Sequence, residues 1–328
     1  MKALVCHAFG PIENLRVVEI AAPALGPGQL LIDVRAASIN FPDALMVQGL
    51  YQVKPALPFT PGAELAGVVA AVGEGVTAFK PGDRVFASTG TGAFAEQCVA
   101  DAPRAAPLPA NMDFEAGASF MLAYGTSLHA LRTIGRLQPG ESLLVLGAAG
   151  GVGIAAVEIA KALGARVIAA ASSAEKLAFA RRAGADESVD YTQPEWRKQV
   201  EALTEGRGAD VVYDPVGGPY SEPALRATAW RGRYLVVGFA AGEIPKLPLN
   251  LALLKERAIL GVFWGAAMQR DPVQQRADLR QLSEWFAAGK LRPPITERVP
   301  LAGAAAAISR LASRQAMGKL VVVPKGSA

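Results

Sequence analysis

The sequence has little of what metal sites and cross-linked folds require. Its 328 residues include two cysteines, Cys6 and Cys98, and two histidines, His7 and His129. Two cysteines cannot build a four-cysteine structural zinc site, and two histidines cannot build a histidine-rich one. A chain of this size needs no disulfide to fold, so we expect both thiols to be free and buried. The composition therefore predicts a protein without a bound metal ion.

Long apolar runs and a strong excess of one charge are also missing. No run reaches the roughly 18–20 apolar residues of a membrane helix, and the opening MKALVCHAFG lacks the apolar centre of a signal peptide. The net charge is only +4, and no basic stripe indicates nucleic-acid binding. We therefore expect a cytoplasmic protein that binds neither membranes nor nucleic acids. Its length predicts two domains, and 51% hydrophobic residues can fill large cores.

The first part of the chain has the pattern of a compact β domain. Alternating apolar and polar stretches occur at 15–20, 29–36 and 65–72, separated by turn signals such as the KPGD at 80–83. Short strands at close spacing indicate a small barrel or sandwich.

The pattern changes at about residue 124, where apolar strands begin to alternate with helices. The expected elements run in the order strand 142–148, helix 152–163, strand 166–171, helix 174–183, strand 209–214 and strand 232–238. This alternation predicts a doubly wound parallel sheet. Two more helices, at 273–288 and 302–312, and a last strand at 319–323 follow. We expect that last strand to pair back into the first domain.

A glycine-rich loop joins the first of these strands to its helix. Residues 147–153 read GAAGGVG, and a buried strand followed by a helix is the context that makes such a loop informative. Gly150 would let the backbone approach a dinucleotide pyrophosphate, and Gly153 would let helix and strand pack closely. The expected binding loop is Ala149, Gly150, Gly151, Val152 and Gly153. The alternative is a tight turn without a ligand.

The end of the second strand indicates which dinucleotide binds. An NAD site carries an acid there, which holds the ribose hydroxyls. This chain has Ser172 and Ser173 instead, followed by Lys176. Hydroxyl donors and a positive charge suit the 2′-phosphate of NADPH. The alternatives are a helix cap for the serines and a solvated surface position for the lysine.

At this point the chain resembles the zinc-free quinone oxidoreductases, or zeta-crystallin group, of the medium-chain dehydrogenases/reductases. The match is strongest in GESLLVLGAAGGVGIAAVEIAK at 140–161, where the family usually has Gln in place of Glu158. Further matches span the chain, namely residues 37–51, 58–69, 80–86, 123–131, 214–218 and 317–322. The resemblance implies an α/β protein with a GroES-like β-barrel domain over 1–122, a Rossmann domain over 123–264, and a return to the first domain over 265–328.

The resemblance also implies further cofactor contacts. Tyr191 would lie beside the 2′-phosphate, and the nicotinamide side would be contacted by Thr126, Gly238, Phe239, Phe263, Trp264 and Lys319. The alternatives are core packing for Phe263 and Trp264, and an ordinary surface or interdomain position for Tyr191.

Zinc-dependent relatives in the same superfamily hold their metal with residues that this chain lacks. Their Gly-His-Glu element corresponds to residues 62–64, where Ala63 occupies the ligand position, and the stretch 38–40 contains no cysteine. Without a metal, the substrate must itself accept a hydride readily, as quinones and enones do. By resemblance, Tyr51 and Asn40 lie at the mouth of the cleft between the domains. Tyr51 would donate a hydrogen bond or proton, and Asn40 would orient substrate or nicotinamide; the alternatives are cofactor-wall packing and turn capping.

Two further expectations concern assembly and an alternative role. The family often pairs through its last Rossmann strand, and the apolar stretch 258–263 suits such edge pairing, so we expect a homodimer. Some members of the zeta-crystallin group have structural or RNA-binding roles. The alternative is therefore a cofactor-binding protein of that kind, although no basic and aromatic surface pattern supports it.

Overall fold

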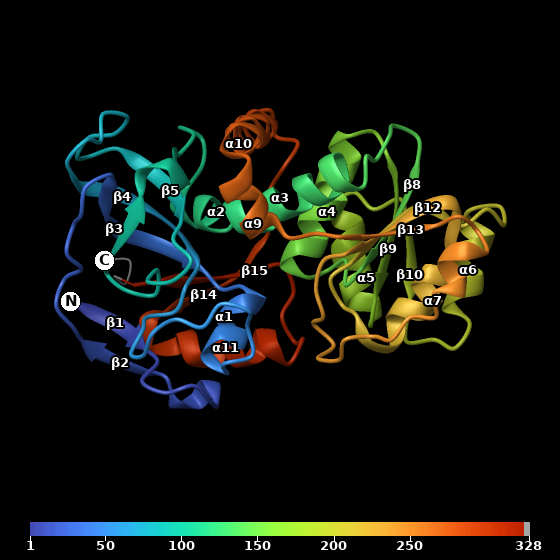
Figure 1. Ribbon diagram of the computed structural model, residues 1–328, viewed down its shortest axis with the longest axis horizontal. Coiled ribbons are helices and arrows are strands. Elements are labelled where there is room, and N and C mark those ends of the chain that lie inside the picture. The colour runs from blue at the N-terminus through green and yellow to red at the C-terminus, as the bar shows by residue number, and fades with distance from the viewer. Residues whose placement is uncertain (325–328) are drawn as a thin grey trace. The chain divides into compact units, whose positions relative to one another are not determined.

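The structure is a computed structural model that describes residues 1–324, and it divides into two compact units (Figure 1). Of the described residues, the first unit combines 1–122 with 293–324, and the second comprises 123–292. The first unit is thus discontinuous in sequence, and the second is inserted between its two segments.

A mostly antiparallel sheet forms the first unit. Its strands, in spatial order, are β14 (Ile295–Pro300), β15 (Lys319–Val323), β3 (Gln29–Ser38), β4 (Glu64–Val72), β5 (Arg84–Ser88) and β7 (Ala105–Pro107), with β6 (Gln97–Asp101) pairing to β3. A separate antiparallel ribbon consists of β1 (Lys2–Val5) and β2 (Arg16–Glu19). Helices are few and short in this unit, namely α1 (Phe41–Val47), α2 (Phe114–Ala118) and α11 (Ala304–Ala312), with 3₁₀ turns at Ile12–Asn14, Ala102–Arg104 and Leu301–Gly303.

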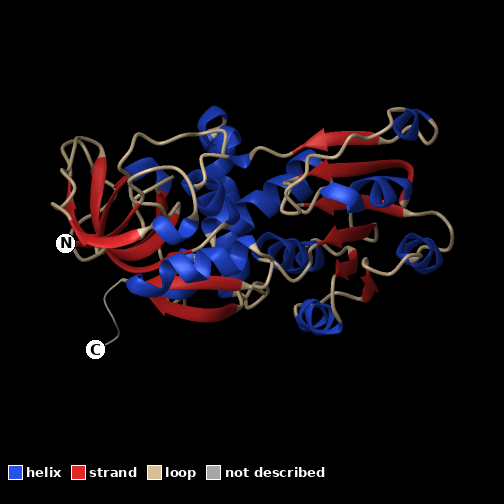
Figure 2. Ribbon diagram, turned by 90° about the horizontal axis from the view of Figure 1, so that it is seen from below, coloured by secondary structure: helices blue, strands red, loops and turns tan. Residues whose placement is uncertain are grey.

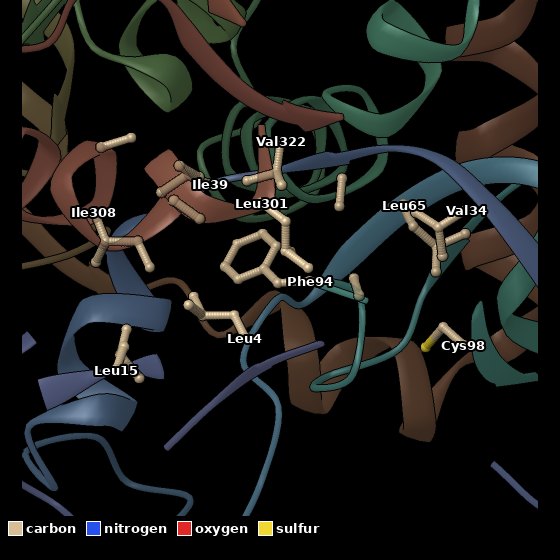
Figure 3. Close-up of a cluster of buried hydrophobic side chains, with 14 of the residues drawn as sticks. Leu4, Leu15, Val34, Ile39, Leu65, Phe94, Cys98, Leu301, Ile308 and Val322 are labelled. Atoms are coloured by element: carbon tan, nitrogen blue, oxygen red, sulfur yellow. The ribbon is translucent and has the colours of Figure 1, made fainter. Parts of the chain in front are cut away.

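The last strand completes this sheet, as the sequence predicts. β15 pairs antiparallel with β3, and Val321 lies opposite Ser38. Figure 3 shows the core beneath it, where Leu301 and Val322 from the C-terminal segment pack around Phe94. The hydrophobic core of the first unit is therefore shared between residues from both ends of the chain.

The second unit is built on a six-stranded sheet in which every pairing is parallel. Its order is β10 (Glu187–Asp190), β9 (Arg166–Ala171), β8 (Ser142–Leu146), β11 (Ala209–Asp214), β12 (Thr228–Val236) and β13 (Ala258–Gly261). The residues of β8 are all buried, as expected of a strand covered on both faces. The chain winds outward from β8 in one direction and then from β11 in the other, which creates a switch point between these two strands.

Helices flank this sheet (Figure 2). They are α3 (Met121–Leu128), a π-helical turn (His129–Ile134), α4 (Gly151–Ala162), α5 (Ala174–Arg182), α6 (Trp196–Leu203), a 3₁₀ turn (Gly218–Tyr220), α7 (Ser221–Arg226), α8 (Asn250–Leu253), α9 (Trp264–Arg270) and α10 (Pro272–Ala287). The predicted fold class, a Rossmann sheet plus a GroES-like β domain, is confirmed.

The expected boundary at residue 265 differs from the division that the structure shows. Residues 265–292 belong to the second unit rather than to the C-terminal return. The buried carboxylate of Asp278 on α10 pairs with Arg132 of the π-helical turn, and Trp264 Nε1 donates to Gln275 Oε1 at 3.0 Å. These contacts hold α9 and α10 against the second unit, and the return begins only at Pro293.

Candidate functional site

The predicted cofactor residues of the second unit follow the carboxyl ends of its strands. Because all six strands are parallel, these ends share one edge of the sheet. In α/β sheets of this kind, ligands bind at that edge beside the switch point. The fold therefore gathers residues that are far apart in the sequence, most of them within a few positions of a strand end.

The glycine loop after β8 is shaped by its own backbone. Gly150 caps α4, and its N–H donates to the carbonyl of Gly147 at 2.9 Å. A Cβ on Gly153 would lie 2.2 Å from that same carbonyl oxygen and 2.9 Å from Cα of Ala148. The fold itself therefore excludes any side chain at 153, as expected for a helix that packs closely on its strand.

Gly150 is different, because the fold does not demand glycine there. Its φ of −79° suits any residue, and a Cβ would come no closer than 3.4 Å to its nearest neighbour, the Gly147 carbonyl oxygen. A ligand phosphate approaching the N-terminus of α4 would explain the choice of glycine, since the free N–H groups and the helix dipole attract anions. The loop thus fits a dinucleotide pyrophosphate.

The end of β9 carries the residues expected to select NADPH. Ser173 caps α5, and its Oγ accepts from the N–H of Lys176 at 3.3 Å. The ammonium of Lys176 folds back to Ser172 Oγ, also at 3.3 Å. The capping role of Ser173 and a phosphate-binding role are compatible. Lys176 is half-buried at the end of the strand.

Tyr191 lies beside this group. Its N–H donates to the carbonyl of Ala171 at 3.2 Å, which fixes it next to the end of β9. Its ring contacts that of Tyr220, with centroids 4.4 Å apart and planes inclined by 41°. Tyr220 was missed from the sequence, because it lies in a 3₁₀ turn after β11 and no local pattern links it to Tyr191.

The loop after β11 is held by a buried carboxylate. Asp214 accepts hydrogen bonds from the N–H groups of Val216 and Gly217 at 2.7 and 2.9 Å, from Ser221 Oγ at 2.8 Å, and from the phenol of Tyr234. The neighbouring Gly238 and Phe239 follow β12, and Gly238 N–H reaches the Asp214 carbonyl at 3.3 Å. Asp214 thereby fixes the backbone at which the predicted residues 238 and 239 lie.

The expected nicotinamide neighbours separate into buried and exposed positions. Trp264 is buried with its indole against α3, since a Cβ on Gly125 would lie 2.5 Å from its ring. Phe263 is 55% exposed. Thr126 is half-buried on α3, and the next residue, Ser127, donates to the Val152 carbonyl of the glycine loop at 3.0 Å.

Asn40 and Lys319 lie in the first unit, where they form a buried polar network. Lys319 Nζ donates to Asn40 Oδ1 at 2.7 Å and lies 3.3 Å from Glu64 Oε1. Asn40 Nδ2 donates to the same Glu64 oxygen at 2.9 Å and to the Ser38 carbonyl at 3.2 Å. Both amide hydrogens of Asn40 are thus engaged within the protein. Glu64 was not singled out from sequence, although an acid inside an apolar strand was the available signal.

Tyr51 follows α1 and packs half-buried against the core of the first unit. Burial raises the pKa of its phenol, and the charge of Asp43 adds to this rise. Asp43 was also missed. It lies in the first turn of α1, fully buried, and its Oδ2 accepts the N–H of Asn40 at 2.7 Å. The spacing Asn-x-x-Asp before a helix was the sequence signal that could have marked it.

The residues described by the structure do not offer a zinc site. Within residues 1–324, no three His, Cys, Asp or Glu side chains are grouped so that they could hold a metal ion. Ala63 is buried at the position of the histidine ligand, and Cys6 and Cys98 are free and buried. In the same residues, no helix has the length and apolar character needed to cross a membrane.

Two family models match the chain. The alcohol dehydrogenase GroES-like domain matches residues 26–110, and the model described as zinc-binding dehydrogenase matches residues 151–288. Each match falls within one of the two structural units.

Relatives of known name match over almost the whole chain. A quinone oxidoreductase-like protein 2 homolog of Nematostella vectensis is 38% identical over 99% of this chain and 89% of its own length. The quinone oxidoreductase of Pseudomonas aeruginosa is 38% identical over 97% of this chain and 98% of its own. The crystal structure of Escherichia coli quinone oxidoreductase complexed with NADPH superposes with a TM-score of 0.91, 30% identity and coverage of 99% and 100% of the two chains. The resemblance found in the sequence is therefore confirmed, and the chain belongs to the quinone oxidoreductase family of the medium-chain dehydrogenases/reductases.

Proposed function

We propose that this chain is an NADPH-dependent reductase of quinones or α,β-unsaturated carbonyl compounds that works without a metal. The choice of NADPH over NADH rests on the residues at the end of β9. There the Lys176 ammonium contacts Ser172 Oγ, and the acid that precedes Lys176, Glu175, is exposed. A cation and hydroxyl donors stabilise the dianionic 2′-phosphate, whereas an acid would repel it. The E. coli relative, whose structure contains NADPH, supports this proposal.

The glycine loop and Tyr191 would hold the rest of the dinucleotide. The N–H groups at the start of α4 would bind the pyrophosphate, with Gly150 allowing close approach. Tyr191, stacked on Tyr220, would lie beside the 2′-phosphate. The residues proposed for the nicotinamide half are Gly238, Phe239, Phe263, Trp264 and Thr126. Lys319 is proposed to act indirectly, through Asn40, since its ammonium is occupied by the buried network.

Bound NADPH would supply a hydride. In an enone the hydride adds to the β-carbon, and the π electrons move to the carbonyl oxygen, which then needs a proton or a strong hydrogen bond. We propose that the phenol of Tyr51 gives that hydrogen bond or proton, while Asn40 fixes the backbone that carries α1 and Tyr51. No group in this scheme requires a Lewis acid, because the substrate itself takes up the charge.

A substrate and cofactor panel tests the proposal. Purified protein should oxidise NADPH in the presence of 1,2-naphthoquinone or a simple enone. Its kcat/KM for NADPH should be at least tenfold higher than its kcat/KM for NADH. Equal efficiency with both dinucleotides would contradict the cofactor assignment. Tight NADPH binding without turnover of any quinone or enone would instead favour the alternative, a cofactor-binding protein without this activity.

The metal-free proposal has its own measurement. The buried Ala63 and the separate, buried cysteines support it. Elemental analysis of active protein should find far less than one zinc per chain, and a chelator should leave turnover unchanged. Stoichiometric zinc, or activity lost on chelation, would contradict it.

We also propose a homodimer formed through β13. This strand lies at the end of the sheet order and pairs with β12 on one side only, and its outer edge is suited to pairing with a second copy. Light scattering at micromolar concentration should return twice the chain mass. A monomer mass would overturn this proposal without affecting the proposed reaction.

A further inference from the structure

The buried network of the first unit contains more negative than positive side chains. Asp43, Glu64 and Lys319 are 0%, 1% and 3% exposed, so two carboxyl groups share one ammonium. Burying an uncompensated charge costs several kcal/mol. The cluster therefore reaches neutrality most easily when one carboxyl group carries a proton.

The contacts indicate which carboxyl group carries it. Glu64 accepts from Asn40 Nδ2, from Lys319 Nζ, and from the N–H of Leu122 at 2.8 Å, an arrangement that suits a carboxylate. Asp43 accepts the Asn40 N–H through Oδ2 at 2.7 Å, and the Gly62 N–H also faces its carboxyl group, but no ammonium or guanidinium forms an ion pair with it among the described residues. Burial, the largest cause, and the charge on Glu64 raise the pKa of Asp43 to about 7, against the opposing effects of the Asn40 N–H, Lys319 and the Gly62 N–H.

Asp43 is coupled to Tyr51 through one short segment. Both belong to α1 and the turn that continues it, where Gly49 N–H donates to Met46 O at 3.0 Å and Leu50 N–H to Leu45 O at 2.8 Å. A negative charge on Asp43 raises the pKa of the Tyr51 phenol. The charge state of one side chain therefore changes the acidity of the other.

The charged groups that β4, β15 and α11 place around α1 are paired with one another or with β14. Glu64 faces it from β4 and Lys319 from β15, and these two are linked to each other. α11 packs against α1, and its charged residue, Arg310, pairs with Glu297 of β14. Asp43, which forms no ion pair among the described residues, is thus the member of this group that takes up a proton most readily.

We propose that Asp43 is a positioning residue that holds a proton in the segment that carries Tyr51, so that the phenol acts as an effective donor only while Asp43 is neutral. This inference rests on the proposed donor role of Tyr51. With Asp43 neutral, the phenol is more acidic and a negative charge can develop next to it. Once Asp43 ionises, donation would place a second negative charge in the same buried region, and donation is disfavoured.

The test is the pH dependence of enone turnover. Between about pH 6 and pH 8, kcat of the wild type should fall about tenfold, as the protonated fraction of a group titrating near pH 7 does. Asp43→Asn keeps the shape, the neutral charge and an oxygen for the Asn40 N–H, so its kcat should stay nearly constant over this range. Asp101→Asn, which removes an exposed carboxylate from the same unit, should retain the wild-type profile.

Further variants separate this inference from the proposed function. If Asp43→Asn retains the wild-type slope while Tyr51→Phe lowers kcat and abolishes the slope, the role of Asp43 is overturned and Tyr51 remains the donor. If Tyr51→Phe changes neither rate nor slope, the donor assignment itself fails. A purely structural Asp43 would shift the melting temperature and leave the slope unchanged.

A second measurement does not depend on a folded Asp43 variant. Infrared difference spectra of the wild type and of Glu158→Gln, which removes the other buried carboxyl group of raised pKa, should both show loss of a protonated carboxyl C=O band as pH rises through 7. Absence of that band at pH 6 would overturn the inference even if Asp43→Asn failed to fold.

Discussion

Nζ of Lys319 lies 2.7 Å from Oδ1 of Asn40, although 279 positions separate the two residues. This contact fixes the orientation of the amide, because its nitrogen then faces Glu64 and the Ser38 carbonyl. Turning the amide toward a ligand would leave buried groups unpaired, at about 1–3 kcal/mol each. Asn40 is therefore better suited to holding α1 in place than to contacting substrate.

Asn40→Ala should act mainly on stability. We expect the free energy of unfolding to fall by about 2–4 kcal/mol, since Glu64 and Lys319 both lose a buried partner. Urea denaturation with two independent probes measures this change. Asn14→Ala, at an exposed 3₁₀ turn of the same unit, is the matched control and should cost less than about 1 kcal/mol. Unchanged stability combined with a large loss of turnover would show that Asn40 contacts the reactants directly.

The two loop glycines should respond differently to the same methyl group. Gly153→Ala should destabilise the second unit by about 1–3 kcal/mol, because its Cβ would overlap the Gly147 carbonyl oxygen. Gly150→Ala should leave the melting temperature nearly unchanged, yet weaken NADPH binding in a fluorescence titration. Wild-type NADPH affinity in a well-folded Gly150→Ala variant would argue against pyrophosphate binding at this loop.

Lys176→Ala should lower catalytic efficiency with NADPH at least tenfold, about 1.4 kcal/mol, and leave NADH nearly unaffected. The reason is that the ammonium over Ser172 would face the phosphate that only NADPH carries. Steady-state kinetics with both dinucleotides measure this difference. Lys198→Ala removes an exposed lysine that pairs with Glu195 and should change neither value. An equal loss with both cofactors would assign Lys176 to general folding or pyrophosphate binding.

Tyr51→Phe should distinguish the two substrate classes. Enone turnover should fall at least tenfold, since a positioned acid contributes about 10²–10⁴ in rate. Quinone turnover should fall much less, because a quinone spreads the developing charge over an aromatising ring. NADPH affinity should barely change, as the ring is kept. Equal losses for both substrates together with weaker NADPH binding would make Tyr51 a packing residue of the cofactor wall.

Glu158→Gln should stabilise the protein in a pH-dependent way. The carboxylate accepts from Tyr124 OH at 2.7 Å and from the N–H of Arg292 at 3.0 Å, and burial raises its pKa in the folded state. A raised pKa means that the folded protein binds this proton more tightly than the unfolded chain. Stability contributed by the protonated form is thus lost as pH rises from about 4 through the folded value.

The neutral glutamine keeps an oxygen for both donors and avoids that loss. The melting temperature of Glu158→Gln relative to wild type should therefore be higher at about pH 7.5 than at about pH 4.5. Glu74→Gln, at an exposed position, should show no such trend. A difference that is constant with pH would mean that Glu158 does not titrate in this range.

The sequence pattern correctly predicted several strands whose bounds are set by their own residues. The strands at Arg166–Ala171, Ala209–Asp214 and Lys319–Val323 have the predicted bounds, because apolar runs buried in a sheet are bounded by turn or charged residues. The amphipathic α10 was also expected, but its pattern shows only that one face is buried, and not against which unit. That is why the boundary at 265 differs from the division in the structure.

The candidate site was predictable only where its residues are close together in the sequence. The glycine loop, Ser172, Ser173 and Lys176 follow from strand–turn–helix order alone. The pairing of Tyr191 with Tyr220, and the joining of Asn40 to Glu64 and Lys319, depend on tertiary contacts between distant segments. The cytoplasmic location stays a prediction.

The place of β15 between β14 and β3 has a consequence for the order in which the chain matures. During synthesis, residues 123–292 emerge as one continuous stretch and can fold as they appear. The β domain that precedes them must wait, with Ala37 and Ser38 at the end of β3 lacking their partner strand and Phe94 incompletely covered, until Leu301 and Val322 have been made. The partly synthesised chain therefore exposes an unpaired strand end that can pair with other chains. We expect dependence on chaperones to be greatest during this interval.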